Sequence, residues 1–267
     1  MRIALSQFTS GPEPEKNLAL IEDDTHRAAA AGARVVVFPE ASMACFGTPL
    51  APIAQPLDGP WADAVRAIAA AAGTVVVAGM FTPAPHGRVA NTLLATGQGV
   101  EAAYDKIHLY DAFGYAESDT VAAGSRIVTI DIESVRMGLA TCYDVRFPEL
   151  FRAHADVGAV ATLLAASWGA GPGKREQWEL LVRARALDAT LWVAAVDQAD
   201  PAAGGVVAHS SAPTGIGHSM VVGPDGTVRA GLEAEPGLLI ADLDVDEVAA
   251  VRKKTSVLAN RRLGRDS

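Results

Sequence analysis

Hydrophobic positions along the chain follow two patterns: short runs that are almost entirely apolar, and longer stretches with apolar residues three or four positions apart. The first pattern is typical of strands buried on both faces, and the second of helices with one buried side. Strands are predicted at residues 3–8, 35–38, 75–80, 91–96, 101–106, 127–132, 135–142, 160–165, 191–196, 218–222, 227–230 and 238–243. Helices are predicted after the G-P-E-P turn to about residue 31, and at residues 61–72, 148–155, 175–190 and 245–253.

The order of these elements indicates an α/β chain with mixed sheets. Strands and helices alternate, but several strands are adjacent, and hairpins are predicted around G-Q-G and G-P-D-G. This many strands would fit into two sheets covered by helices. Because composition does not shift along the chain, we expect one domain over residues 1–267, with about ten polar residues as a tail.

Composition narrows the function classes. The 267 residues are half hydrophobic, which is enough for a large core, and the net charge is −9 without a basic run. Nucleic-acid and anionic-membrane binding are therefore not expected, and apolar stretches such as residues 157–166 are too short to span a bilayer. Two cysteines, Cys45 and Cys142, make no disulfide framework, and the N-terminus lacks a signal-peptide pattern. We expect a cytoplasmic protein, with Cys45 interpreted as a packing residue.

One cysteine stands at a position suited to chemistry. In S-V-R-M-G-L-A-T-C-Y-D-V-R-F-P-E-L, alternating residues indicate a strand that ends at Cys142, and Pro148 marks a helix start. A cysteine at a strand-to-helix turn meets backbone N–H groups and a positive dipole end, which favour a thiolate. The alternative is a buried cysteine that acts as a small hydrophobe.

Two further residues hold comparable positions. Glu40 and Lys106 each follow a predicted strand, as Cys142 does, and functional groups in α/β proteins gather at the carboxyl ends of strands. If the three strands are neighbours, an acid–base residue, a cation and a thiol converge, and this combination suits acyl transfer. Taken singly, Glu40 and Lys106 would be interpreted as solvated turn residues.

Three segments resemble a known family. They are V-F-P-E around Glu40, Y-D-K-I-H-L-Y-D around Lys106 and T-C-Y-D-V-R-F-P-E-L around Cys142. Their order, spacing and context resemble the nitrilase superfamily of carbon–nitrogen hydrolases. The resemblance implies a Glu40–Lys106–Cys142 triad, a four-layer αββα sandwich with two mixed β-sheets, and assembly into homodimers or larger homo-oligomers.

The resemblance also implies roles around the triad. Glu117, in Y-A-E-S-D, matches a glutamate that orients the lysine and supports the substrate amide. Tyr143 matches the position whose backbone N–H helps bind the oxyanion, and Trp168, in A-S-W-G, lies where the family places an aromatic residue near the substrate. Otherwise Glu117 would be a solvated loop residue and Trp168 a packing residue.

Within the superfamily, the chain resembles amidases that hydrolyse deaminated glutathione. The similar segments are K-I-H-L-Y-D-A-F-G-Y-A-E-S, G-P-G-K-R-E-Q-W, R-A-R-A-L-D-A-T and L-A-N-R-R, whereas residues 200–211 look longer and richer in Ala and Gly than is usual there. A substrate with a carboxylate at each end would need a cation, and Arg146 and Lys174 are the candidates. The alternative for Arg146 is an ion pair with Asp144 or Glu149.

The expected reaction is amide hydrolysis through a thioester on Cys142, with Lys106 and the Tyr143 N–H at the oxyanion and Glu40 as general acid, then base. For deaminated glutathione the products would be 2-oxoglutarate and Cys-Gly. No metal or organic cofactor is expected, since six His and two Cys residues show no zinc-ligand spacing.

Three alternatives remain open. An ω-amidase or small aliphatic amidase would share the triad. A papain-like enzyme would need His108, His154, His209 or His218 beside Cys142. An inactive family member could act as a binding or assembly module.

Overall fold

The computed structural model describes residues 1–112, 114–205 and 212–263. In this part of the chain the strands form a seven-stranded sheet, a six-stranded sheet and a two-stranded ribbon. The seven-stranded sheet has the order β15 (Gly237–Asp242), β1 (Arg2–Gln7), β2 (Val35–Val37), β3 (Val75–Pro83), β4 (Val89–Gly97), β5 (Val100–Asp105), with β8 (Val121–Ala122) beside β4. The six-stranded sheet has the order β14 (Val228–Gly231), β13 (Met220–Val222), β12 (Trp192–Asp197), β11 (Ala161–Ala166), β10 (Val135–Thr141), β9 (Thr129–Ile132).

Both sheets are mixed, as predicted. Strands β1, β2 and β3 pair in parallel in the first sheet, and β10, β11 and β12 in the second. The outer neighbours pair antiparallel, except that β8 runs parallel to β4, and the ribbon consists of β6 (Asp111–Ala112) and β7 (Tyr115–Ala116). Because β5 is antiparallel to β4, which is antiparallel to β3, the strands β2, β3 and β5 end at the same edge of the first sheet.

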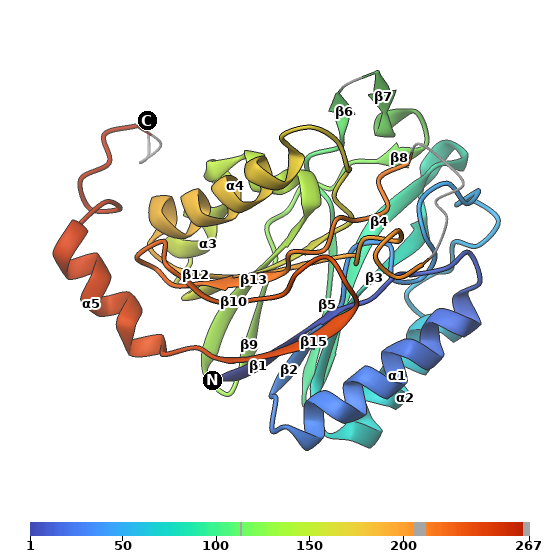
Figure 1. The fold of residues 1–267 in the computed structure, drawn as a ribbon, viewed down its shortest axis with the longest axis horizontal. Helices are drawn as coiled ribbons and strands as arrows, with labels where there is room; N and C mark the ends of the chain where they lie inside the picture. Colours follow the sequence, from blue (N-terminus) through green and yellow to red (C-terminus); the bar gives the residue numbers. More distant parts are fainter. Residues whose placement is uncertain (113, 206–211, 264–267) are drawn as a thin grey trace.

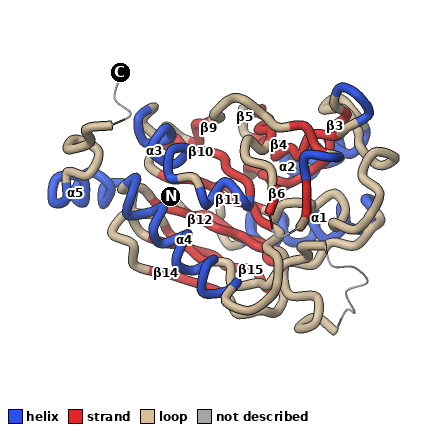
Figure 2. Tube along the Cα trace, turned by 90° about the horizontal axis from the view of Figure 1, so that it is seen from above, coloured by secondary structure: helices blue, strands red, loops and turns tan. Residues whose placement is uncertain are grey.

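Helices cover the outer faces of the two sheets. Helices α1 (Pro14–Ala30) and α2 (Pro60–Ala72) lie on one side, and α3 (Pro148–Asp156) and α4 (Lys174–Ala189) lie on the other (Figures 1 and 2). Helix α5 (Val245–Thr255) follows β15 at the end of the molecule away from α1 and α2 (Figure 1). The predicted αββα sandwich is therefore confirmed.

The strands are almost entirely apolar because both faces of each sheet are buried. In β1, Leu5 packs into the core between the sheets, whereas its neighbour Ala4 packs under α1 and α2. In the second sheet, Leu163 joins the central core and Leu164 packs under α3 and α4. With no solvated face, a strand has no polar alternation, as the sequence pattern indicated.

The structure departs from the expected elements in three connections. Three short 3₁₀ helices appear in the described chain, η1 (Pro85–Gly87), η2 (Glu117–Asp119) and η3 (Cys142–Arg146). The last separates β10 from α3, so Cys142 does not lie at the start of the helix that begins at Pro148. The unpatterned stretch 107–124 contains β6, β7, η2 and β8, and the loop after residue 200 lies outside the described ranges at residues 206–211.

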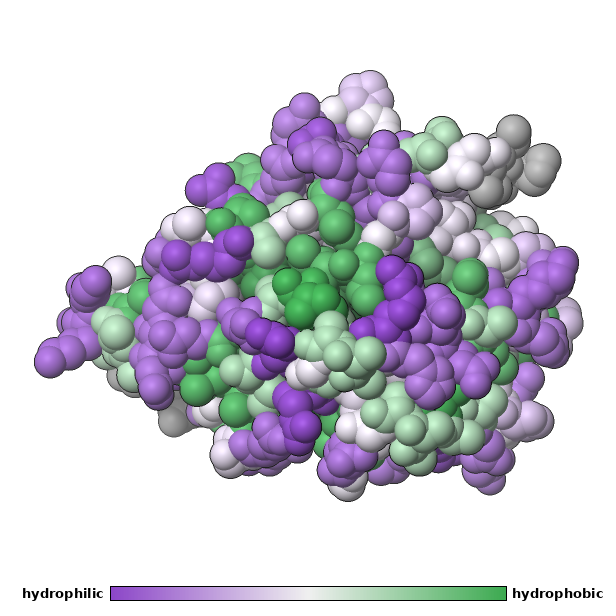
Figure 3. Space-filling model, turned by 60° about the horizontal axis from the view of Figure 1, so that its bottom comes forward, coloured by the Kyte–Doolittle hydropathy of each residue, from purple (hydrophilic) through white to green (hydrophobic). Residues whose placement is uncertain are grey.

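Two surface features complete the fold. No described helix combines the length and the apolar character needed to cross a membrane. Figure 3 shows hydrophobic side chains gathered near the middle of one face. Strand β15, at an edge of the first sheet, carries the half-buried residues Leu238, Leu239 and Ile240.

Candidate active site

Glu40 follows β2 by three residues and is completely buried. Its Oε1 accepts hydrogen bonds from Lys106 Nζ at 2.9 Å and from Asn91 Nδ2 at 2.7 Å, and its Oε2 accepts from the backbone N–H of Ser167 at 2.9 Å. Gly79 of β3 permits this placement, because a Cβ there would lie 2.8 Å from the carbonyl oxygen of Pro39. The carboxylate is therefore held from both sheets.

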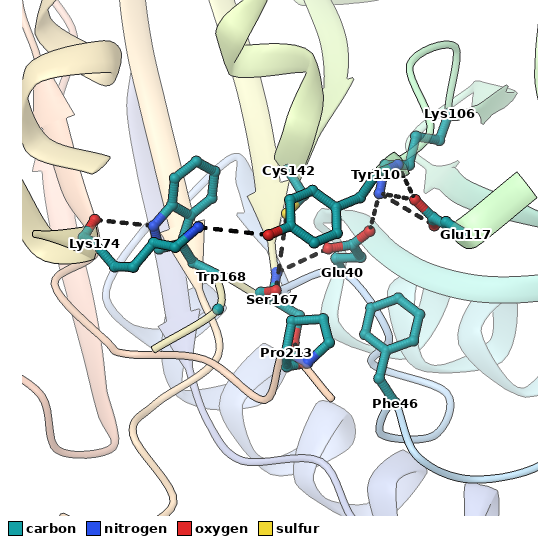
Figure 4. Close-up of a pocket in the computed structure, with 11 residues that line it drawn as sticks. Glu40, Phe46, Lys106, Tyr110, Glu117, Cys142, Ser167, Trp168, Lys174 and Pro213 are labelled. Carbon is teal, nitrogen blue, oxygen red and sulfur yellow. Dashed lines mark hydrogen bonds and ion pairs between the residues drawn. The ribbon is translucent and has the colours of Figure 1, made fainter. Parts of the chain in front are cut away.

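Lys106 directly follows β5, and its ammonium group lies between two carboxylates (Figure 4). Its Nζ donates to Glu117 Oε2 at 2.8 Å as well as to Glu40. Glu117, from η2, also accepts from the Tyr110 N–H at 2.7 Å. All three charged side chains are at least 97% buried, so solvent screens their interaction little.

Cys142 is the first residue of η3 and has a φ of 46°, in the left-handed region that non-glycine residues rarely occupy. The residue is 7% exposed, and its Sγ lies 3.8 Å from the carbonyl oxygen of Ser167. Backbone strain of this kind is common at functional positions, because it aims one side chain away from the regular element.

The charges around Cys142 correct one expectation. Burial raises the pKa of the Cys142 thiol well above its ordinary value, and the charge of Glu40 raises it further, against the lowering effect of Lys106. Burial and the charge of Glu40 therefore oppose the expected thiolate, and the turn that begins at Cys142 is the short η3, with α3 following only from Pro148. The site needs a base that removes the thiol proton when substrate is bound.

Glu40 and Lys106 have complementary proton affinities. Burial raises the pKa of Glu40, although the charge of Lys106 opposes this, and the charge of Glu117 adds to it. Burial alone would lower the pKa of Lys106, but the negative charges of Glu40 and Glu117 outweigh burial and raise it. Lys106 is therefore a permanent cation, and Glu40 is a carboxyl group suited to gaining and losing a proton.

These side chains open into one cavity. Cys142, Glu40, Lys106 and Glu117 form its polar part. Its aromatic part consists of Phe46, Tyr110 and Trp168 (Figure 4). The three predicted triad residues therefore meet, although Glu40 and Lys106 come from the first sheet and Cys142 from the second, so the strands that carry them are not all neighbours.

Of the other candidate site residues, two line the cavity and two do not. Trp168 and Lys174 line the cavity, the Trp168 Nε1 donates to the Lys174 carbonyl oxygen at 3.0 Å, and Lys174 Nζ donates to the Tyr110 hydroxyl at 3.5 Å. Burial lowers the pKa of Lys174, and the charge of Arg146 adds to this. Tyr143 packs edge-on against Tyr110, with ring centroids 5.2 Å apart, and is not among the lining residues.

Arg146 is half-buried and contacts an aromatic residue of the cavity, although it does not itself line the cavity. Its guanidinium group is 5.3 Å from the Trp168 ring centroid, and its Nη2 donates to Gln177 Oε1 at 2.7 Å. Among the described residues it forms no ion pair with Asp144 or Glu149, so the ion-pair alternative is wrong, and its role toward a substrate carboxylate stays a prediction. The contact with Trp168 shows that Arg146 supports the aromatic wall.

Sequence reasoning missed two buried aspartates. Asp144 accepts from the Thr141 N–H at 2.8 Å, which is a capping-box pattern visible as T-x-x-D. Asp197, at the end of β12, accepts from the N–H groups of Trp168 at 2.7 Å and Ile216 at 2.8 Å. Burial raises the pKa of Asp197 to about 8. The rule that strand ends carry functional groups would have identified Asp197.

Three of the four histidines considered beside Cys142 have other partners. His108 Nδ1 lies 2.7 Å from Asp144, His154 Nδ1 lies 3.1 Å from Thr162 Oγ1, and His218 Nδ1 lies 3.6 Å from Glu233. His209 lies outside the described residues. No group of three His, Cys, Asp or Glu side chains suited to a metal ion occurs in the described part of the chain.

Comparison with known proteins agrees with this geometry. The family model for carbon–nitrogen hydrolases matches residues 2–253. A hydrolase of Mycobacterium tuberculosis (Rv0480c) is 54% identical over 98% of this chain and 95% of its own, and a deaminated glutathione amidase of Escherichia coli O157:H7 is 34% identical over 98% and 97%.

A solved structure shows the same fold with a modified cysteine. It is a mutant amidase of Nesterenkonia sp. AN1 that carries the acetamide moiety of fluoroacetamide on its active-site cysteine. It matches with a TM-score of 0.80 and 28% identity, over 98% of this chain and 94% of that chain. The chain therefore belongs to the carbon–nitrogen hydrolase family, as a cysteine-dependent amidase that acts on carbon–nitrogen bonds other than peptide bonds.

Proposed function

We propose that Cys142, Lys106 and Glu40 form the catalytic triad of this amidase, and that the substrate is deaminated glutathione. The observation that best supports this proposal is the buried ion pair of Lys106 and Glu40. Lys106 Nζ lies 2.9 Å from Glu40 Oε1, and both residues line the same cavity as Cys142. Such a group combines a nucleophile, a proton carrier and a fixed cation. Glu117 holds the ammonium group of Lys106 from the other side.

In the first step Glu40 takes the proton of the Cys142 thiol, and the sulfur attacks the amide carbonyl carbon. Lys106 and the Tyr143 N–H hold the negative oxygen that forms, and losing one such donor typically costs about 2.7–4 kcal/mol of barrier. Glu40 then gives its proton to the amide nitrogen, the C–N bond breaks, and the amine leaves a thioester on Cys142.

In the second step water replaces the amine. Glu40 removes a proton from the water as its oxygen attacks the thioester carbonyl. The C–S bond breaks, and the proton on Glu40 returns to the sulfur as the acid departs. The elevated pKa of Glu40 supports this alternation, because a carboxyl group that titrates closer to neutral pH can act as both acid and base.

Two observations support deaminated glutathione as the substrate. The relative from E. coli is named as an amidase for it, and Lys174 brings a positive charge to the cavity, where a substrate carboxylate could pair with it. We assign Lys174 and the Tyr110 hydroxyl, 3.5 Å apart, to the 2-oxo acid end, and Trp168, braced by Arg146, to the wall beside it.

The test compares kcat/KM for deaminated glutathione, 2-oxoglutaramate and a neutral aliphatic amide, with Cys142→Ala as control. A strong preference for deaminated glutathione that the variant loses would support triad and substrate. Turnover of only the smaller amides would favour an ω-amidase on the same triad. Equal, negligible rates in wild type and variant would favour a binding module instead.

Lys106→Met separates the triad from a cysteine–histidine pair. The triad predicts a loss of at least about a hundred-fold in kcat, because the oxyanion loses a cationic donor. A cysteine–histidine pair would tolerate the change. Intact mass measurement with fluoroacetamide would show whether the variant still forms the covalent adduct.

We also propose a homo-oligomer located in the cytoplasm. The edge strand β15, with its half-buried apolar residues, supports self-association, and the two free cysteines fit a reducing compartment. Light scattering coupled to size exclusion would give the number of subunits, and a monomeric mass would contradict the first part.

A further inference from the structure

A second hollow, open to solvent, borders the catalytic cavity. It is lined by residues 46–52, 86–89 and 119–120, and Phe46 belongs to the lining of both spaces. The Phe46 ring packs edge-on against Phe81, with centroids 5.7 Å apart, which holds it as a fixed divider. A ligand longer than the catalytic cavity would pass along Phe46 into this hollow.

Arg88 brings a permanent positive charge to the hollow. Its carbonyl oxygen accepts from the Ala84 N–H at 2.9 Å, so the backbone of this turn is held in place, and the residue is half-buried. Within the described ranges, the guanidinium group of Arg88 has neither a hydrogen bond nor an ion pair. Asp119 and His86, both exposed, also line the hollow.

The spacing from Arg88 to the catalytic carboxyl suits a dipeptide. Asn91, whose Nδ2 contacts Glu40, lies three residues after Arg88, about 10 Å along the backbone at strand rise, and Arg88 itself precedes β4, which begins at Val89. An amine leaving group made of two residues spans about 7 Å from its nitrogen to its carboxylate. The flexible arginine side chain can cover the remainder.

The positions of Lys174 and Phe46 fit the orientation that the proposed reaction requires of the substrate. Figure 4 shows Lys174 and Phe46 on opposite sides of Cys142 and Glu40, with Phe46 on the side of Glu40. Because Glu40 protonates the departing amine, that amine must lie near Glu40. The acyl part of the substrate then points to Lys174, and the leaving group points past Phe46 toward Arg88.

We propose that this hollow binds the peptide leaving group of the substrate and that Arg88 pairs with its terminal carboxylate. The proposal rests on the function proposed above and extends it. It assigns the two carboxylates of the substrate to separate cations, Lys174 at the acyl end and Arg88 at the amine end. It also explains why a peptide amide would be preferred over a primary amide.

The test uses Arg88→Ala and three substrates: deaminated glutathione, its analogue with a C-terminal glycinamide, and 2-oxoglutaramate. A charge-assisted hydrogen bond predicts a loss of about ten- to hundred-fold in kcat/KM for deaminated glutathione, mainly through KM. We expect rates within about two-fold of wild type on the other two substrates, which lack the carboxylate that Arg88 would bind. Arg88→Lys should recover part of the loss, and Arg126→Ala, which removes an exposed charge elsewhere, should change nothing.

Two results would overturn this proposal without touching the proposed function: an unchanged kcat/KM of Arg88→Ala on deaminated glutathione, or an equal loss on all three substrates. A wild-type enzyme that hydrolyses 2-oxoglutaramate but not deaminated glutathione would instead overturn the substrate assignment, and the Arg88 subsite with it. Selective loss on the one substrate with the free carboxylate supports both.

Discussion

The Tyr104 hydroxyl donates a hydrogen bond to Asp144 Oδ2 at 2.6 Å and thereby joins the two halves of the site. Tyr104, in β5 of the first sheet, precedes Lys106 by two residues, and Asp144, in η3 after the second sheet's β10, follows Cys142 by two residues. Asp144 also accepts from His108 Nδ1 at 2.7 Å. The lysine and the nucleophile therefore keep their relative positions through one buried carboxylate.

Tyr104→Phe should weaken this connection. Asp144 is fully buried, so an oxygen that loses a donor costs about 1–3 kcal/mol of unfolding free energy. We expect kcat to fall by about ten-fold while KM changes little, because the reacting groups are displaced relative to each other. Urea unfolding and steady-state kinetics check both parts, and wild-type values in both would contradict the role of this bond.

Asn91 should tune the proton affinity of Glu40. Its Nδ2 donates to Glu40 Oε1 at 2.7 Å and to Glu117 Oε1 at 3.4 Å, which stabilises the ionised carboxylates. Asn91→Ala removes the donor, and Asn91→Asp replaces it with another acid, so both should raise the pKa of Glu40 further. Because the base form of Glu40 starts the reaction, the acidic limb of kcat/KM should move to higher pH, more for Asp than for Ala. A limb that stays in place, or moves to lower pH, would refute this.

Gly79→Ala should displace Glu40 without removing any of its hydrogen-bond partners. The added Cβ would lie 2.8 Å from the backbone atoms Pro39 O and Ala41 N on either side of Glu40. Overpacking of this kind costs about 1–3 kcal/mol of unfolding free energy. We expect kcat to fall by about ten-fold or more. Gly231→Ala is the matched control, since its nearest contact would be 3.5 Å away.

Asp197 should make the stability depend on pH. Its pKa is about 8 in the folded protein because of burial, whereas an unfolded aspartate titrates at about 3.9. Between these values the folded protein holds a proton that the unfolded chain has released, so the free energy of unfolding falls as pH rises. The slope from this group is at most about 1.4 kcal/mol per pH unit.

Asp197→Asn removes this dependence. The variant should be less stable than wild type near pH 5, because its amide N–H₂ faces the N–H donors of Trp168 and Ile216, and the difference should shrink toward pH 8. Urea unfolding at pH 5, 6, 7 and 8 measures it, with the exposed Asp58→Asn as control. A difference that is constant or grows with pH would contradict the elevated pKa.

Local sequence patterns predicted most elements and the chemistry-bearing positions. The apolar run at β2 and the alternation at β10 indicated where Glu40 and Cys142 would follow strands, since periodicity reports which faces are buried. The 3₁₀ turn at Cys142 escaped prediction, because a left-handed φ of 46° at a cysteine has no sequence signature. Asn91 escaped too, because an asparagine inside a strand carries no signal without its spatial neighbours.

By itself the sequence determined the order of strands and helices and the residue types at the strand ends, since these follow from hydrophobic periodicity and from motifs that are contiguous in the chain. Only the tertiary structure decided that Glu40 and Lys106 face Cys142 across two sheets, that Arg146 contacts the Trp168 ring, and that burial raises the pKa of the Cys142 thiol. Convergence, burial and pKa depend on contacts between residues far apart in the chain, and such contacts exist only once the sheets have packed.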